Sequence, residues 1–240
     1  MLRQLRVAIG FLTILPVSPR EFRRDDLGRA VPFFPLVGVI YATLTWGLLQ
    51  IFNKFLPNEI VAWLVVLAMV LLNGGIHWDG WADTADGLGG HTPEKSLAIM
   101  KDSRLGAFGG MALVFLLLGK VLLLSQLTQE SWLIFVGIAV WSRWTMVYLL
   151  YTQPSVSRGL LTLFQLESAW YGLSISTILA LLLTIWLGSL LVVFLSSSVI
   201  GLTIVILIIR KKFGGITGDL LGATNELVEL LALLLCLIFV

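Results

Sequence analysis

Apolar residues in this chain fall into blocks long enough to cross a lipid bilayer. Of its 240 residues, 58% are hydrophobic and only 12% are charged, a composition far from that of soluble domains. A helix needs about 20 mostly apolar residues to span the hydrocarbon core of a membrane. The sequence therefore predicts an all-α polytopic membrane protein.

The apolar runs predict about seven transmembrane helices in a single domain over residues 1–240. The fifth and sixth runs could form a tight hairpin, or could be divided differently around Gly188. With one cysteine, Cys236, no disulfide framework is available. The predicted spans are residues 31–51, 60–76, 107–127, 132–151, 173–194, 196–209 and 220–240.

The first segment, MLRQLRVAIGFLTILPVSP, is too short for a confident span. A signal peptide is one interpretation, because basic residues precede apolar ones. No small-residue cleavage site follows, so we expect an amphipathic helix at the membrane interface.

Basic residues favour one orientation in the membrane. Arg20, Arg23, Arg24 and Arg29 precede the first predicted span, and by the positive-inside rule they keep the N-terminus in the cytoplasm. The predicted outer loops, residues 52–59 and 128–131, then hold a single basic residue, Lys54. The predicted inner loops hold Lys95, Lys101, Arg104, Arg158, Arg210, Lys211 and Lys212. The sequence thus predicts a multi-pass membrane protein whose N-terminus lies in the cytoplasm.

The motif HWDGWADTADGLGG, residues 77–90, carries the most chemistry. Asp79, Asp83 and Asp86 stand at i, i+4 and i+7, which places them on one face of a helix. Three neighbouring carboxylates repel one another, and a hard cation such as Mg²⁺ relieves that repulsion. An acidic, solvated helix face is the plainer reading, but the many flanking glycines disfavour it.

Two further polar segments belong to the same predicted cytoplasmic side, namely MKDSRLGAFGG at 100–110 and KKFGGITGDLLGATNELVEL at 211–230. In the second, Asp219, Glu226 and Glu229 fall roughly on one helical face. Carboxylates inside an apolar span are functional candidates, although Glu226 and Glu229 could instead form salt bridges with the basic residues of other spans, Lys120 and Arg143.

Other polar residues are candidates for binding substrate. Arg104 could clamp a phosphate or pair with nearby Asp102. His77 could bind metal or phosphate, and is a weaker candidate. Lys211 and Lys212 could attract an anionic nucleotide, although the positive-inside rule explains them equally well. No stretch of basic and aromatic residues suggests nucleic-acid binding, and a homo-oligomer is compatible with the sequence.

Three strings in this order, GGIHWDGWADTADG, MKDSRLGAFGG and GGITGDLLGATNELVEL, with FFPLVG near the first span, resemble the motifs of the cobalamin synthase (adenosylcobinamide-GDP ribazoletransferase) family. The resemblance covers nearly the whole chain, and the acids of these strings do not depart from it. It implies transfer of a cobinamide phosphoryl group from adenosylcobinamide-GDP to α-ribazole or its 5′-phosphate, with release of GMP and Mg²⁺ as cofactor.

On this resemblance, Asp79, Asp83 and Asp86 hold Mg²⁺, and Asp102, Asp219 or Glu226 completes the metal shell or acts as base. We expect Asp86 to be the base or a ligand of a second metal, and Arg104 to hold the leaving-group phosphate. The catalytic residues expected are therefore Asp83, Asp86 and Asp102. The corrinoid is too large for a closed pocket between helices, so we expect an open cytoplasmic cleft.

Two other functions remain open. The DGxxD pattern also resembles the CDP-alcohol phosphatidyltransferases of lipid head-group synthesis, but Ala82, Asp83 and Thr84 depart from the longer signature of that family. A cation-coupled transporter would also place acids in the membrane, but it should have polar groups near the bilayer midplane and a path to both sides.

Overall fold

The computed structural model describes residues 1–21, 23, 25–127, 131–156, 161, 164–165 and 170–239. Over these residues the secondary structure is helical, apart from one isolated bridge between Ser155 and Ile216. The expectation of an all-α protein is confirmed. Arg24, Arg158 and most of the predicted loop 128–131 lie outside the described residues.

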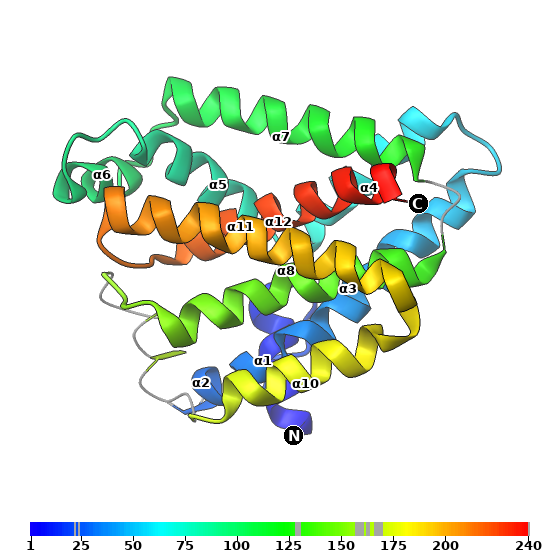
Figure 1. Cartoon of the computed structure of the whole chain (residues 1–240), viewed down its shortest axis with the longest axis horizontal. Helices are drawn as coiled ribbons and strands as arrows, with labels where there is room; N and C mark the ends of the chain where they lie inside the picture. Colours follow the sequence, from blue (N-terminus) through cyan, green and yellow to red (C-terminus); the bar gives the residue numbers. More distant parts are fainter. Residues whose placement is uncertain are drawn as a thin grey trace.

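The helices lie side by side as a bundle of roughly parallel and antiparallel rods (Figure 1). Short 3-10 or π turns connect some of them: η1 (Val31–Phe33), η2 (Ile185–Leu190) and η3 (Ile209–Phe213). In chain order the helices are α1 (Leu2–Leu12), α2 (Asp26–Ala30), α3 (Phe34–Phe52), α4 (Asn58–Leu72), α5 (Ile76–Gly87), α6 (Pro93–Met100), α7 (Ala107–Gln126), α8 (Trp132–Thr152), α10 (Gly172–Thr184), α11 (Leu191–Ile208) and α12 (Gly218–Phe239).

Five segments of the described chain are long and apolar enough to span a membrane, and a bent pair of helices brings the number to six. This supports a multi-pass membrane protein. One of the five, Gly172–Phe213, is divided at Gly188, whose φ of 56° is left-handed. Figure 1 shows α10 and α11 running in opposite directions from this point. This agrees with the expectation that the fifth and sixth apolar runs could form a hairpin. The larger number of about seven spans stays a prediction.

The second predicted span, residues 60–76, extends too far toward the C-terminus. Helix α4 stops at Leu72, and α5 starts at Ile76 after a bend of 90°. Gly74 and Gly75 cause the bend, because their φ angles of +65° and +76° are left-handed and end a right-handed helix. The bend turns α5, which carries the acidic motif, away from the direction of α4.

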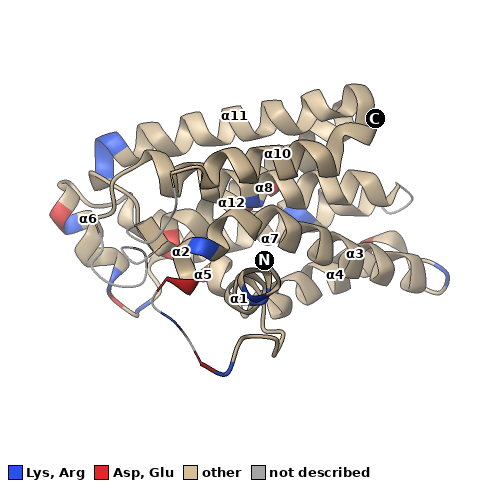
Figure 2. Cartoon of the chain, turned by 90° about the horizontal axis from the view of Figure 1, so that it is seen from below, with Lys and Arg blue, Asp and Glu red and all other residues tan. Residues whose placement is uncertain are grey.

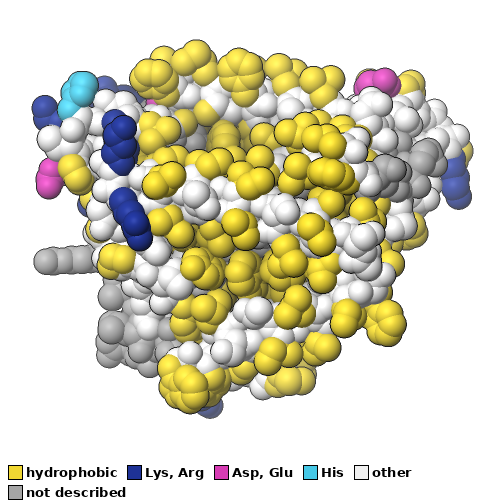
Figure 3. All heavy atoms as spheres, viewed as in Figure 1, with side chains coloured by type: hydrophobic (Ala, Val, Ile, Leu, Met, Phe, Trp, Pro, Cys, Tyr) yellow, Lys and Arg dark blue, Asp and Glu magenta, His cyan; other side chains and the backbone are white. Residues whose placement is uncertain are grey.

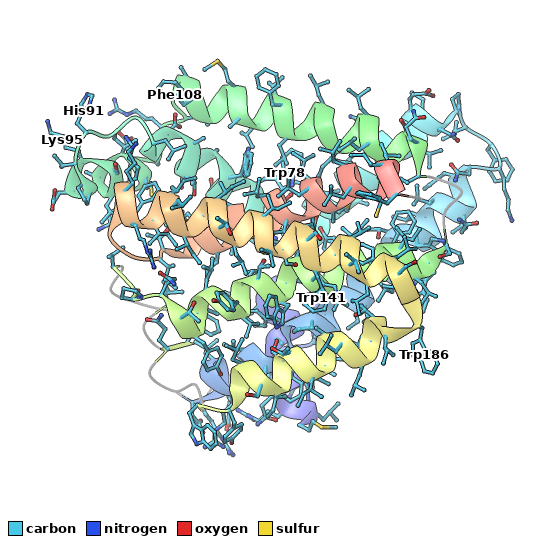
Figure 4. The ribbon with its side chains drawn as sticks, viewed as in Figure 1. Trp78, His91, Lys95, Phe108, Trp141 and Trp186 are labelled. Atoms are coloured by element: carbon cyan, nitrogen blue, oxygen red, sulfur yellow. The ribbon has the colours of Figure 1, made fainter. Side chains whose placement is uncertain are left out.

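Helix α8 lies at the centre of the bundle and is buried along most of its length, packing on α3, α10, α11 and α12. Figure 4 shows Trp141 of this helix in the interior. Helix α1, which was predicted to lie at the interface, packs one face on α2 and α3, where Val7 and Ala8 are buried. Apolar side chains form a broad band over the visible outer surface (Figure 3).

Charged residues gather mainly at one end of the bundle, near α6 and the connection between α11 and α12 (Figure 2). His91 and Lys95 lie at this end, beside the start of α7 (Figure 4). We call it the charged end. All three polar sequence segments reach it: α5, the connection from α6 to α7, and the start of α12.

Candidate active site

Helix α5 presents two of its aspartates to an open cleft. Asp79 is exposed and Asp83 is half-buried, one turn apart on the same face. The cleft has a volume of about 700 Å³, and Ser103 and Leu105 from the connection to α7 line it together with these acids. The geometry supports the expectation of an open cleft, and residues of two of the sequence motifs line it.

Helix α12 brings Asp219 to the same acids. It crosses α5 closely at Gly80, where an added Cβ would lie 2.6 Å from the carbonyl oxygen of Asp219. Any larger residue at this position would separate the two helices. Asp219 thereby adds its negative charge to those of Asp79 and Asp86 of α5, and all three act on Asp83. Residues separated by more than a hundred positions in sequence thus form one acidic region.

Asp86 has a different position from the one expected. Its Oδ2 accepts a hydrogen bond from the Gly106 N–H at 2.8 Å, and its Oδ1 accepts one from the Gly109 N–H at 2.8 Å. These N–H groups belong to the first turn of α7, which lacks partners within its own helix. A negative charge at a helix N-terminus is also favourable. The geometry indicates an anchor between α5 and α7 rather than a free base, and these two donors are not available to a substrate phosphate.

A prediction follows for the glycines around this anchor. In Gly109→Ala, the new Cβ would collide with the Asp86 carboxylate and come within 2.9 Å of the Ala82 carbonyl oxygen. Overpacking of this kind costs about 1–3 kcal/mol, so we expect a lower thermal unfolding midpoint in detergent. In the control Gly110→Ala, the atom nearest to the new Cβ is Leu105 Cδ2 at 3.9 Å. Its thermal unfolding midpoint should be unchanged or slightly higher. Equal effects of the two substitutions would contradict the anchor.

Asp102 and Arg104 pair with each other at the charged end. Arg104 donates to both carboxylate oxygens of Asp102, with Nε 3.0 Å from Oδ1 and Nη2 2.6 Å from Oδ2, while the Arg104 side chain remains 87% exposed. The hydrogen bonds from Arg104 lower the pKa of Asp102 to about 2. A carboxylate with so low a pKa is a weak base at neutral pH, which disfavours the expected catalytic role of Asp102.

The two lysines after α11 differ in their contacts. Lys212 Nζ donates to the carbonyl oxygens of Leu88 and Gly90, at 2.9 and 3.1 Å, and so caps the C-terminal end of α5. Lys211 is exposed at the charged end. Of this pair, only Lys211 has the exposure expected of a residue that attracts substrate.

His77 and Glu226 lie in the bundle interior rather than in the cleft. Glu226 pairs with Lys120, and its Oε1 is 3.6 Å from Nδ1 of His77. Lys120 also donates to Glu229 at 2.7 Å, and Arg143 donates to Glu229 at 2.9 Å. Each of these four residues is only 1% exposed. The two basic and two acidic groups balance, so this buried charge network realises the salt-bridge alternative for both glutamates.

Comparison with known proteins identifies the family. The family model described as cobalamin-5-phosphate synthase matches residues 4–237. The chain belongs to this family. The resemblance noted in the three motifs is thereby confirmed.

Curated relatives in the cobalamin-5-phosphate synthase family match over nearly their full length. The protein of Geotalea daltonii is 36% identical, with 98% of this chain and 96% of the relative covered. The protein of Thermodesulfovibrio yellowstonii is 32% identical, with 98% and 95% covered. Both are named adenosylcobinamide-GDP ribazoletransferase. No solved structure matches the chain.

The side chains of the acidic region show whether this chain has suitable ligands for the expected Mg²⁺. Within the described residues, no group of three or more His, Cys, Asp or Glu is close enough to hold a metal ion by itself. Mg²⁺ commonly uses one or two carboxylates, with water and substrate phosphates as its other ligands. Asp79 and Asp83 in an open cleft fit that smaller set, whereas Asp86 is engaged with α7 and Glu226 with Lys120.

Sequence reasoning did not find the contribution of the loop before α7 to the cleft. Ser103 and Leu105 line the cleft, and Gly106 and Gly109 fix Asp86. The signal is the glycine-rich segment SRLGAFGG itself, because glycines at a helix start can present N–H groups to a phosphate or allow close helix packing. The structure directs two of those N–H groups to a carboxylate of the protein.

Proposed function

We propose that this chain transfers the cobinamide phosphoryl group of adenosylcobinamide-GDP to α-ribazole or α-ribazole 5′-phosphate, and releases GMP. The names of the curated relatives support this reaction. The structural observation that carries it is the open cleft of about 700 Å³ lined by Asp79 and Asp83. A corrinoid substrate needs such an open site, and a diphosphate needs cations beside it.

We assign Mg²⁺ binding to Asp79 and Asp83, with the substrate diphosphate as the remaining anionic ligand. Mg²⁺ bound in this way would neutralise charge on the phosphate oxygens. Asp219 is the additional carboxylate that α12 brings to this region. When no metal is bound, these carboxylates repel one another and would also repel the diphosphate. Binding of Mg²⁺ together with the diphosphate is therefore favoured.

Asp219 is the carboxylate we assign as general base. It is half-buried, and no ion pair engages it among the described residues. In the reaction, the ribazole hydroxyl oxygen forms a bond to the phosphorus attached to the cobinamide arm, while the bond from that phosphorus to the bridging oxygen of the diphosphate breaks. GMP leaves with the bridging oxygen, and the hydroxyl proton passes to Asp219.

The basic residues at the charged end would bind the anionic nucleotide. Arg104 is 87% exposed and adjoins Ser103 and Leu105 of the cleft, so its guanidinium can exchange Asp102 for a phosphate without crossing the protein. Lys211 would add a weaker, longer-range attraction. We place the charged end on the cytoplasmic side of a bacterial or archaeal inner membrane, with the N-terminus on the same side.

The test is GMP release by the purified protein in detergent, given adenosylcobinamide-GDP with and without α-ribazole 5′-phosphate. We expect release that needs both substrates and Mg²⁺ and that stops when a chelator removes the metal. Release without the ribazole would mean hydrolysis rather than transfer. Unchanged release in the presence of chelator would overturn the assignment of Mg²⁺.

A further inference from the structure

A second, apolar cavity of about 160 Å³ adjoins the acidic region. Ile76 lines both this cavity and the open cleft, so the two spaces are neighbours. Asp219 lines the cavity too, and it is the carboxylate that α12 brings beside Asp79 and Asp83. A molecule could therefore occupy the cavity and still reach the acidic region.

Aromatic side chains from distant parts of the chain form one wall of this cavity. Phe11 of α1 lies 4.7 Å from Phe164 and 6.0 Å from Phe34 of α3, measured between ring centroids. Phe34 and Phe164 are 6.2 Å apart. These distances and the mixture of stacked and edge contacts are typical of packed aromatic pairs, whose faces and edges suit contact with another ring. Met146 and Leu150 of α8 extend the apolar lining.

Polar groups occur at a limited part of the lining. Asp219 and His77 are the titratable side chains there, and the other lining residues are apolar or glycine. This arrangement suits a ligand with a flat apolar body and one polar end. An apolar cavity of about 150 Å³ is large enough to hold an aromatic ring, so the volume here suits an aromatic base.

We propose that this cavity receives the benzimidazole base of the ribazole, so that the attached ribose lies beside Asp219 and the cleft. This inference rests on the proposed function and names the part of the protein that selects the acceptor. The acceptor hydroxyl must lie within about 3–3.5 Å of the phosphorus before reaction. A base held behind Asp219, with the diphosphate bound through the Mg²⁺ that Asp79 and Asp83 would hold, arranges the two substrates in that way.

The test uses substitutions that fill one of two similar cavities. Leu150→Phe adds volume to the proposed base site. Its control, Leu227→Phe, adds the same volume to a separate apolar cavity of about 160 Å³ between α5, α11 and α12. We expect Leu150→Phe to raise the KM for α-ribazole 5′-phosphate about tenfold or more, with the KM for adenosylcobinamide-GDP within about twofold of wild type. The control should leave both KM values unchanged.

Free benzimidazole supplies a second measurement that does not depend on a variant. It should inhibit wild-type GMP release competitively with the ribazole and not with adenosylcobinamide-GDP, and should inhibit Leu150→Phe much less. Inhibition that is not competitive with the ribazole, or equal KM changes in both variants, would overturn the base site. If wild type releases no ribazole-dependent GMP at all, the proposed function fails instead. A cavity filled by a lipid chain would make benzimidazole inert and the KM for ribazole insensitive to Leu150→Phe.

Discussion

Asp83→Asn should lower the rate of GMP release by about a hundredfold or more at saturating substrates. Asp83 lies in the cleft with Asp79, and it is acted on by the charges of Asp79, Asp86 and Asp219. The amide keeps the shape of the side chain but removes the charge that binds a cation. A lost metal ligand of this kind removes several kcal/mol of transition-state stabilisation, and about 2.7 kcal/mol corresponds to a hundredfold.

The matched control for this substitution is Glu94→Gln. Glu94 is an exposed acid on α6 at the same charged end, outside the cleft lining. The Glu94→Gln variant should release GMP at the wild-type rate. Both variants, Asp83→Asn and Glu94→Gln, should unfold at nearly the same temperature as wild type. If Asp83→Asn keeps near-normal turnover with saturating Mg²⁺, the assignment of Asp83 as a metal ligand is wrong.

The buried charge network should give the largest loss of stability. In Glu229→Gln, Arg143 keeps its charge but loses its carboxylate partner in a site where each is only 1% exposed. Breaking a buried pair by removing one partner costs about 3–5 kcal/mol. For a chain of this size that cost lowers the thermal unfolding midpoint by roughly 6 °C or more. Unfolding in detergent micelles, followed by circular dichroism, measures it.

Two further variants make this prediction specific to burial. The double variant Glu229→Gln, Arg143→Met leaves no unpaired charge at Arg143, so it should lose less stability than the sum of its single substitutions. Asp25→Asn breaks the exposed pair between Asp25 and Arg29, whose Nη2 to Oδ2 distance is 2.9 Å. An exposed helix pair contributes only about 0.3–0.5 kcal/mol. An Asp25→Asn loss equal to that of Glu229→Gln would contradict the argument.

The network also bears on transport. Charged groups in the middle of α7, α8 and α12 are the feature expected of a cation-coupled transporter. Here Lys120 and Arg143 balance Glu226 and Glu229, and the cavity beside them has a volume of only about 30 Å³. That volume is close to the space of one water molecule. This packing favours a role for the network in stability.

The sequence predicted those features that depend on local pattern. Long apolar runs predicted the helices, and the spacing of Asp79 and Asp83 predicted that they share a face. The glycines that flank the acidic motif indicated a weakened helix. The sequence did not indicate a 90° bend at Gly74 and Gly75, because their φ angles depend on the packing of α5 against α7 and α12.

The partners of the polar residues could not be predicted from the sequence. Asp86 had the same spacing as its neighbours, yet its contacts with Gly106 and Gly109 depend on where α7 starts relative to α5. Likewise, Lys120 and Glu226 are separated by 106 residues. The sequence pattern indicates which charged side chains are costly to bury. Only the tertiary arrangement determines which of them neutralise one another.

The tip between α10 and α11 has a consequence for how the protein enters the membrane. No charged residue occurs from Gly172 to Ile209, and Trp186 lies at the tip of this hairpin, away from the charged end (Figure 4). Moving a Lys, Arg or Asp into the centre of a bilayer costs about 2.5–3.5 kcal/mol on insertion scales, and this hairpin incurs no such cost. Arg210, Lys211 and Lys212 follow directly. We therefore expect α10 and α11 to insert together as one unit during biosynthesis, with the basic residues after α11 retained on the side where synthesis takes place.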